Sequence, residues 1–177
     1  MSPKKKTKAE IAFTVFARPV PKPRMTSRDK WIMRKRVKTQ ADHARIKILK
    51  NYWSWTDAVK IYYLMARSKA KNLQNNMFTK CRMGFDFHVP GNPGGDMDNY
   101  IKGVKDALKG LAYADDNSRI ITGYDSSSIQ SCCNECSERV KITKGKNKGQ
   151  FRENCGKVRD CQKGKAVISI KGIIGRN

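Results

Sequence analysis

Residues 95–116 read GDMDNYIKGVKDALKGLAYADD, a stretch with acidic side chains near both of its ends. It follows a glycine- and proline-rich run at residues 90–95 that ends the preceding strand. Apolar side chains then recur every three or four residues, which predicts an amphipathic helix over residues 99–110, and Gly110 is placed to end it. The apolar positions of this helix are Ile101, Val104, Leu108 and Leu111.

Carboxylates stand at both ends of the predicted helix. Asp96 and Asp98 precede its first turn, and side chains two residues apart in an extended segment point to the same side. Lys102 follows Asp98 by four residues on the same helical face, within reach of a phosphate or a metal-bound water. Asp115 and Asp116 come after the helix. Carboxylate oxygens suit Mg²⁺, which also binds substrate phosphates, so the pattern predicts a phosphodiesterase site.

Ordinary helix and turn chemistry explains the same residues in another way. Asp98 or Asn99 can cap the helix, and Asp96 can lie near its positive end. Residues 115–117, Asp-Asp-Asn, are typical of a polar turn. Because two aspartates at this spacing are common, spacing alone leaves both interpretations open.

The surrounding segments predict one small α/β (α+β) domain. Residues 79–89 alternate apolar and polar side chains, the two-residue period of a half-buried strand. The full order is β-α-α-β-α-β-β, which implies a single mixed sheet covered by helices. The other predicted elements are strands over residues 10–18, 119–125 and 166–171, a helix over residues 37–53, and a helix from Thr56 or Asp57 to Lys71.

The chain is strongly basic. Its 38 Lys and Arg residues against 15 Asp and Glu residues give a net charge of +23, which favours an extended polyanion as partner. We expect nucleic acid rather than a membrane, because no apolar run reaches the about 18 residues of a spanning helix and no signal or lipidation motif occurs. Six cysteines without an export signal favour a reducing, cytoplasmic setting with access to DNA.

Two basic segments near the N-terminus have the composition of phosphate-binding surfaces. Residues 1–9 contain four lysines and are expected to form a disordered arm, followed by a domain over residues 10–177. Residues 18–24 contain three prolines, which hold the backbone extended and predict a rigid basic rim beside a nucleic-acid groove. Plain solvated surface is the alternative for both segments. The basic side chains of the rim are Arg18, Lys22 and Arg24.

A polar, cysteine-rich insertion over residues 127–164 separates the last two predicted strands. So polar a segment has no apolar core to order it, and its cysteines therefore predict a structural, zinc-ribbon-like Zn²⁺ site, with free thiols as the alternative. The second cysteine pair is more widely spaced than is usual. The predicted ligands are Cys133, Cys136, Cys155 and Cys161, with Cys132 as a substitute. The basic side chains between them that suit phosphate contact are Lys144, Lys146 and Lys148.

The run from Gly95 to Asp116 resembles the pattern GDxDNxxK, then DALxG, then DD, of the RusA family of Holliday junction resolvases. Residues 19–24, Pro-Val-Pro-Lys-Pro-Arg, are similar to the proline-rich segment that follows the first strand in that family. The resemblance covers most of the chain and excludes the N-terminal arm and the cysteine-rich insertion.

The resemblance implies a small α/β homodimer that binds four-way DNA junctions and makes paired nicks by Mg²⁺-dependent hydrolysis, in DNA recombination and repair. By position it implies that Asp96, Asp98 and Asp116 are the essential metal-binding carboxylates, with Asp115 beside them and Lys102 as the active-site lysine. The choice of Asp116 over Asp115 rests on the resemblance. Two alternatives stay open: a noncatalytic zinc-ribbon nucleic-acid-binding protein, and a nuclease of this family that acts on forks or flaps.

Overall fold

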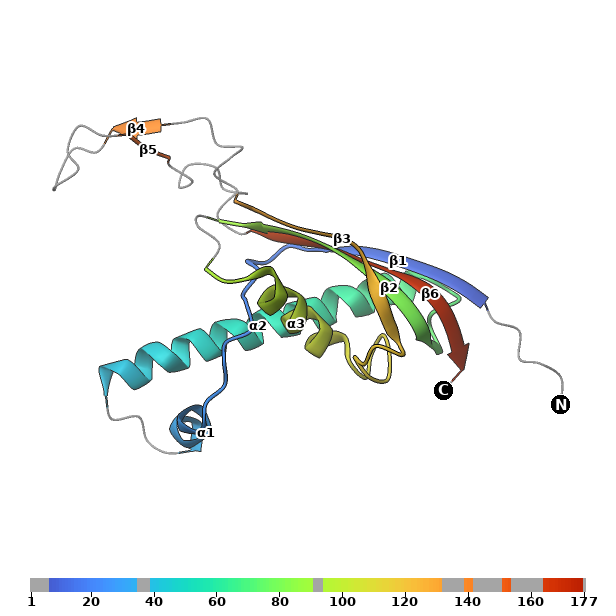
Figure 1. The fold of residues 1–177 in the computed structure, drawn as a ribbon, viewed down its shortest axis with the longest axis horizontal. Helices are drawn as coiled ribbons and strands as arrows, with labels where there is room; N and C mark the ends of the chain where they lie inside the picture. Colours follow the sequence, from blue (N-terminus) through green and yellow to red (C-terminus); the bar gives the residue numbers. More distant parts are fainter. Residues whose placement is uncertain are drawn as a thin grey trace.

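A four-stranded mixed sheet forms the centre of the protein in a computed structural model, which describes residues 7–34, 39–90, 94–131, 139–141, 151–153 and 164–176. The strand order is β1-β6-β2-β3, in which β6 is antiparallel to both β1 and β2, and β3 is parallel to β2. The long helices α2 and α3 lie on one face of this sheet (Figure 1). The strands are β1 (Thr7–Val15), β2 (Asn76–Val89), β3 (Ile121–Ser131) and β6 (Lys165–Arg176).

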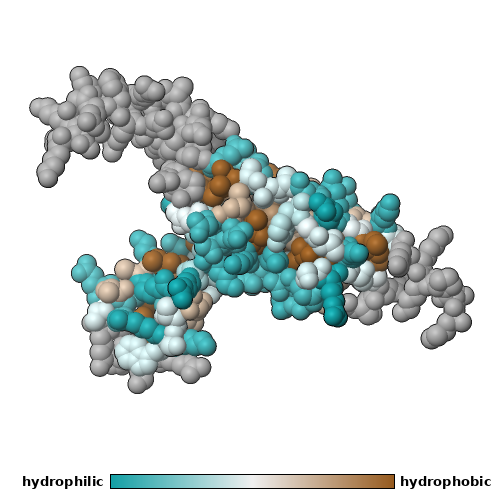
Figure 2. Space-filling model, viewed as in Figure 1, coloured by the Kyte–Doolittle hydropathy of each residue, from teal (hydrophilic) through white to brown (hydrophobic). Residues whose placement is uncertain are grey.

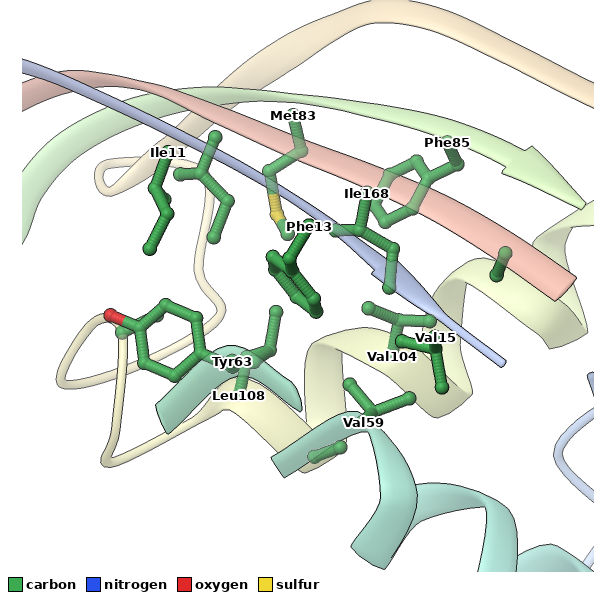
Figure 3. Packing of buried hydrophobic residues seen from close by; sticks show 14 of the residues in the cluster. Ile11, Phe13, Val15, Val59, Tyr63, Met83, Phe85, Val104, Leu108 and Ile168 are labelled. Atoms are coloured by element: carbon green, nitrogen blue, oxygen red, sulfur yellow. The ribbon is translucent and has the colours of Figure 1, made fainter. Parts of the chain in front are cut away.

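The core fills the space between the sheet and the helices. Alternate residues of β1, such as Phe13, turn toward α2, and apolar residues of β2, such as Phe85, turn toward α3 (Figure 3). Val59 of α2 and Val104 of α3 are both fully buried in this layer. Burying one side chain of this size contributes about 1.5–3 kcal/mol, so the alternating pattern of the strands determines which face the helices cover.

Helix α3 (Met97–Leu108) is the crossover between the parallel strands β2 and β3. Its place in the order is as predicted, and it begins and ends two residues earlier than the predicted helix over residues 99–110. The fold class is confirmed: one small α+β domain with a mixed sheet, and the predicted element order.

The two helices predicted over residues 37–71 are one helix, α2 (Gln40–Lys69). The prediction of a second start at Thr56 is wrong, because the Thr56 hydroxyl donates to the Trp53 carbonyl at 2.9 Å within the helix instead of capping a new one. The helix begins after Thr39, whose side chain accepts the Asp42 amide at 3.1 Å.

Helix α1 (Ser27–Arg34) was not predicted and supplies the other helix between β1 and β2. Thr26 and Asp29 cap its start reciprocally: the Thr26 amide donates to Asp29 at 2.7 Å, and the Asp29 amide to the Thr26 hydroxyl at 3.2 Å. Arg45 of α2 donates two hydrogen bonds to the buried Asp29, at 2.6 and 2.8 Å, and holds the pKa of that carboxyl well below its usual range. This ion pair anchors α1 to α2.

All four strands of the main sheet differ in bounds from the prediction, and β2 and β6 are longer than predicted. β1 starts at Thr7, within the segment predicted as an arm, and β3 continues to Ser131, within the predicted insertion. The short strands β4 (Arg139–Lys141) and β5 (Phe151–Glu153) form an antiparallel pair in the insertion. The zinc prediction lies outside the described residues, as do the three lysines between the cysteine pairs. Among the helices that are described, none is long and apolar enough to cross a membrane.

Candidate active site

One face of α3 carries a row of charged side chains. Asp98, Lys102, Lys105 and Lys109 recur at spacings of four, three and four residues, which places them on a single side of the helix. The opposite side is buried against the sheet. The surface over α3 is largely hydrophilic on the face shown in Figure 2. Lys105 and Lys109 were not singled out from the sequence, although their spacing from Asp98 was a sufficient signal.

Asp96 and Asp98 stand at the N-terminal end of this row. Asp96 is the N-cap residue by its backbone, and its carbonyl accepts the Asn99 amide at 3.0 Å, but its side chain makes no capping hydrogen bond. Both carboxylates are exposed, and neither has a hydrogen bond or ion pair within the described residues. Side-chain capping by Asp96 therefore does not account for its presence.

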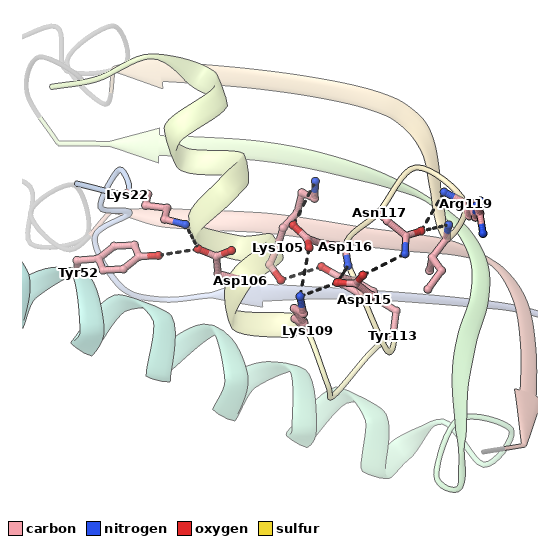
Figure 4. A network of polar contacts seen from close by, with 11 residues as sticks. Lys22, Tyr52, Lys105, Asp106, Lys109, Tyr113, Asp115, Asp116, Asn117 and Arg119 are labelled. Atoms are coloured by element: carbon pink, nitrogen blue, oxygen red, sulfur yellow. Dashed lines mark hydrogen bonds and ion pairs between the residues drawn. The ribbon is translucent and has the colours of Figure 1, made fainter. Parts of the chain in front are cut away.

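Asp115 lies near the C-terminal end of the row and is held firmly. Its carboxylate accepts the Asp116 amide at 2.9 Å and the Asn117 side chain at 3.1 Å, and lies 2.5 Å from the Lys109 amine (Figure 4). The hydrogen bond from Lys109 is the main reason that the pKa of Asp115 falls to about 2. These are the contacts of a polar turn at Asp115, and its part in catalysis stays a prediction.

Asp116 is held more loosely. Its carboxylate lies 3.7 Å from the Lys105 amine and 3.6 Å from the Lys109 amine, which are ion pairs at long range (Figure 4). The side chain is about one-third exposed. Of the two neighbouring aspartates, Asp116 therefore keeps more capacity to bind a ligand.

A single chain does not bring the two pairs of aspartates together. The 12 residues of α3 span about 18 Å at about 1.5 Å per residue, with Asp96 and Asp98 near one end and Asp116 near the other. Within the described ranges, no group of three or more His, Cys, Asp or Glu side chains could hold one metal ion. The cause is topological, because a crossover between parallel strands must run from the C-terminal end of one strand back to the N-terminal end of the next, at the opposite end of the sheet.

The proline-rich segment crosses the N-terminal end of α3. The Lys22 amide donates to the Asn99 carbonyl at 2.9 Å, and a Cβ added at Gly95 would lie 2.9 Å from the Pro21 side chain, so the two backbones are in close contact. Beside this contact lies a groove of about 740 Å³, bounded by the proline-rich segment, α2 and the start of α3. A groove therefore lies beside the basic segment, and its binding of nucleic acid stays a prediction.

The three basic side chains of the rim differ in availability. Arg18 lines the groove and is exposed, and Arg24 is exposed as well. Lys22 instead forms an ion pair at 2.5 Å with Asp106 of α3, which also accepts a 3.4 Å hydrogen bond from Tyr52 (Figure 4). Burial, reinforced by Asp106, raises the pKa of Tyr52 to about 12. Lys22 thus fastens the segment to α3.

Comparison with known proteins identifies one family. Residues 17–143 match the family described as Endodeoxyribonuclease RusA, a range that includes the proline-rich segment, α2, α3 and the four aspartates near the ends of α3. No curated protein matches the chain.

Proposed function

The chain belongs to the RusA family of endodeoxyribonucleases, and on this basis we propose that it resolves four-way DNA junctions by Mg²⁺-dependent hydrolysis. A symmetric homodimer would nick two strands of the junction at equivalent positions, because a two-fold dimer presents two identical sites to a substrate of approximate two-fold symmetry. Recombination and DNA repair are the processes that produce such substrates.

The main support for this proposal is that the carboxylates of Asp96 and Asp98 have no basic partner among the described residues. In a chain of charge +23, every other carboxylate whose side chain is described contacts a basic side chain, whereas these two contact none. Two exposed, unpaired carboxylates beside a groove that Arg18 lines suit a cation that arrives with its substrate. The paired carboxylates are Glu10, Asp29, Asp42, Asp57, Asp86, Asp106, Asp115, Asp116 and Asp125.

Asp96 and Asp98 fit Mg²⁺, which one or two carboxylates commonly bind together with phosphate oxygens of the substrate. When bound, the ion would polarise the scissile phosphate and activate a water for attack. Lys102, one helical turn from Asp98 and exposed, would contact the phosphate and offset its charge. The N-terminal end of α3 adds a positive field at the same place.

We propose Asp116 as the third essential carboxylate. Its position suggests how the two protomers of the dimer together form each metal site. Within one chain, the length of α3 lies between Asp116 and the pair Asp96 and Asp98. A metal ion does not bridge that distance. A two-fold axis beside α3 and perpendicular to it would place the C-terminal end of one helix near the N-terminal end of the other. We therefore assign Asp116 to the site of the partner protomer.

Phosphate contacts outside the site would come from exposed basic side chains. Arg18 and Arg24 flank the groove, and Lys102 and Lys109 line α3. Lys144, Lys146 and Lys148 of the insertion are proposed as further contacts. Such contacts would fix the position of DNA on the protein, and we expect the binding to weaken with salt.

The insertion is proposed to hold one structural Zn²⁺ through Cys133, Cys136, Cys155 and Cys161, with Cys132 as the substitute ligand. We expect about one zinc per chain in protein purified without chelator, because four thiolates form a closed tetrahedral site. Elemental analysis of wild type beside a Cys133→Ser, Cys136→Ser double variant measures this directly. Well-folded wild-type protein that contains no zinc contradicts the assignment.

The test of the function uses an Asp98→Asn variant. It should bind four-way junctions without metal as tightly as wild type and cleave them at least about 100-fold more slowly with Mg²⁺, because the substitution removes a ligand and leaves the phosphate contacts. Asp57→Asn is the matched control, since Asp57 is an exposed aspartate on α2 outside the groove.

Four-way, forked, flapped and linear duplex DNA are compared in the same assay, with Mg²⁺ and with chelator. Preferred cleavage of forks or flaps would change the substrate but keep the chemistry. Binding without cleavage of any substrate by wild type would favour the noncatalytic alternative, and wild-type rates for Asp98→Asn would remove Asp98 from the site.

A further inference from the structure

The groove beside Asp96 has features that phosphate chemistry does not require. It encloses about 740 Å³, a volume typical of a site for a small organic group rather than for a phosphate alone. Its walls come from three prolines of residues 19–23 and from Trp55 and Ala58 of α2. These are flat or small apolar surfaces, which favour a planar, apolar face on the ligand.

The indole of Trp55 supplies the second observation. Trp55 is 2% exposed and lines the groove, and its Nε1–H is buried with no hydrogen-bond acceptor among the residues that the structure describes. Most buried donors in proteins are satisfied, so a ligand that carries an acceptor would complete this site. A planar ring with carbonyl or ring-nitrogen acceptors meets both conditions.

Polar side chains that line the groove could bind the polar edge and the phosphate of such a ligand. Asn51 and Ser54 of α2 are exposed and line the groove, where an amide and a hydroxyl can donate to or accept from the edge of a ring. Arg18 lines the same groove and supplies a permanent positive charge for an attached phosphate. The groove therefore joins a surface for an aromatic ring to a contact for a phosphate.

We propose that this groove binds one unstacked nucleobase of the DNA strand at the branch point. This inference rests on the proposed function, because branched DNA offers bases that unstack at low cost, whereas duplex DNA does not. The base would pack on the proline surface of the groove, with an acceptor on its edge toward the Trp55 N–H, and its phosphate would contact Arg18. Occupation of the groove would hold the strand beside Asp96 and Asp98, so that a branch is positioned for cleavage and a continuous duplex is not.

The test uses 2-aminopurine, a fluorescent base that brightens when it unstacks, placed at successive positions around the centre of a four-way junction. Measurements are made in chelator, so they do not depend on cleavage. Wild-type protein should raise the fluorescence several-fold at one position next to the branch point and at none in a duplex of the same sequence.

A matched pair of variants assigns the signal to the groove. Ser54→Trp places a large ring in the groove, whereas Ser68→Trp makes the same change at an exposed position of the same helix outside it. Ser54→Trp should abolish the fluorescence increase and weaken junction binding about tenfold, within the range for loss of one stacked base. Ser68→Trp should behave as wild type, and Trp55→Phe should lower the increase while circular dichroism stays unchanged.

Failure of this inference and failure of the proposed function give different results. Cleavage of junctions by wild type without any fluorescence increase, or with an increase that Ser54→Trp retains, overturns the nucleobase site and leaves the nuclease in place. A fluorescence increase that Ser54→Trp removes, in a protein that cuts no DNA, supports the base site and rejects the catalytic assignment.

Discussion

At the scale of single residues, Asp115 and Asp116 differ in what surrounds them although they are neighbours in sequence. Asp115 accepts hydrogen bonds from the turn and pairs with Lys109 at 2.5 Å, whereas Asp116 has only ion pairs beyond 3.5 Å. The sequence alone could not separate them, because both follow the helix at nearly the same spacing. The hydrogen bonds of the turn favour a structural role for the first and leave the second available.

This difference predicts opposite effects of two equal substitutions. Asp116→Asn should abolish junction cleavage with little change in thermal stability, because its ion pairs are long and half-exposed. Asp115→Asn should keep most of the activity and lower the thermal midpoint. Cleavage assays and thermal melts on both variants measure this, and a reversed result would exchange the two roles.

The stability loss in Asp115→Asn should depend on pH in a defined direction. The pKa of Asp115 is about 2 in the folded protein against 3.8 as its ordinary value, so the ionised form favours folding. That stabilisation is complete above about pH 5 and disappears as pH falls through about 4 toward 2. The difference in thermal midpoint between wild type and variant should shrink over this window, and a difference that stays constant argues against the Lys109 contact.

At the scale of elements, the strands of the sheet approach so closely at one position of β6 that only glycine fits there. Gly172 lies in β6 between β1 and β2, paired with Ala9 on one side and Cys81 on the other. A Cβ there would overlap the Lys80 carbonyl oxygen and come within 2.7 Å of the Cys81 Cα. The backbones on either side therefore leave no space for a side chain.

Gly172→Ala should destabilise the protein by about 1–3 kcal/mol, the usual cost of forcing a methyl group into a packed region. Gly94→Ala is the control, because a Cβ at Gly94 meets nothing within 4 Å. Denaturant unfolding of the two variants beside wild type measures the difference. Equal stability of all three proteins would mean that the sheet adjusts its registration at low cost.

At the scale of the whole molecule, the crossover topology separates two pairs of aspartates that lie close together in the sequence. Residues 95–116 are contiguous in sequence, yet α3 holds the two aspartate pairs near opposite ends of the strands that it connects. On the proposed assignment, a second protomer supplies the third carboxylate, and catalysis would then depend on the oligomeric state.

A mixed dimer tests this coupling. Asp98→Asn and Asp116→Asn chains with different tags are co-expressed, and the mixed dimer is isolated. If each site uses Asp98 of one protomer and Asp116 of its partner, one site carries both substitutions and the other carries none. A plasmid with an extruded cruciform should then be nicked once to give open circles, whereas wild type gives linear product. No product at all would place both aspartates in the same chain's site.

The sequence by itself determined the strands, the amphipathic α3, the carboxylates at its ends and the family, because these depend on local periodicity and on residues that lie close along the chain. Only the tertiary structure decided that α2 is one helix, that α1 is anchored by Asp29, and that the aspartate pairs stand apart. It also placed the proline-rich segment against α2 to form the groove. The reason is physical: a local pattern records which face of an element is buried, whereas contacts between distant segments depend on how those faces pack together.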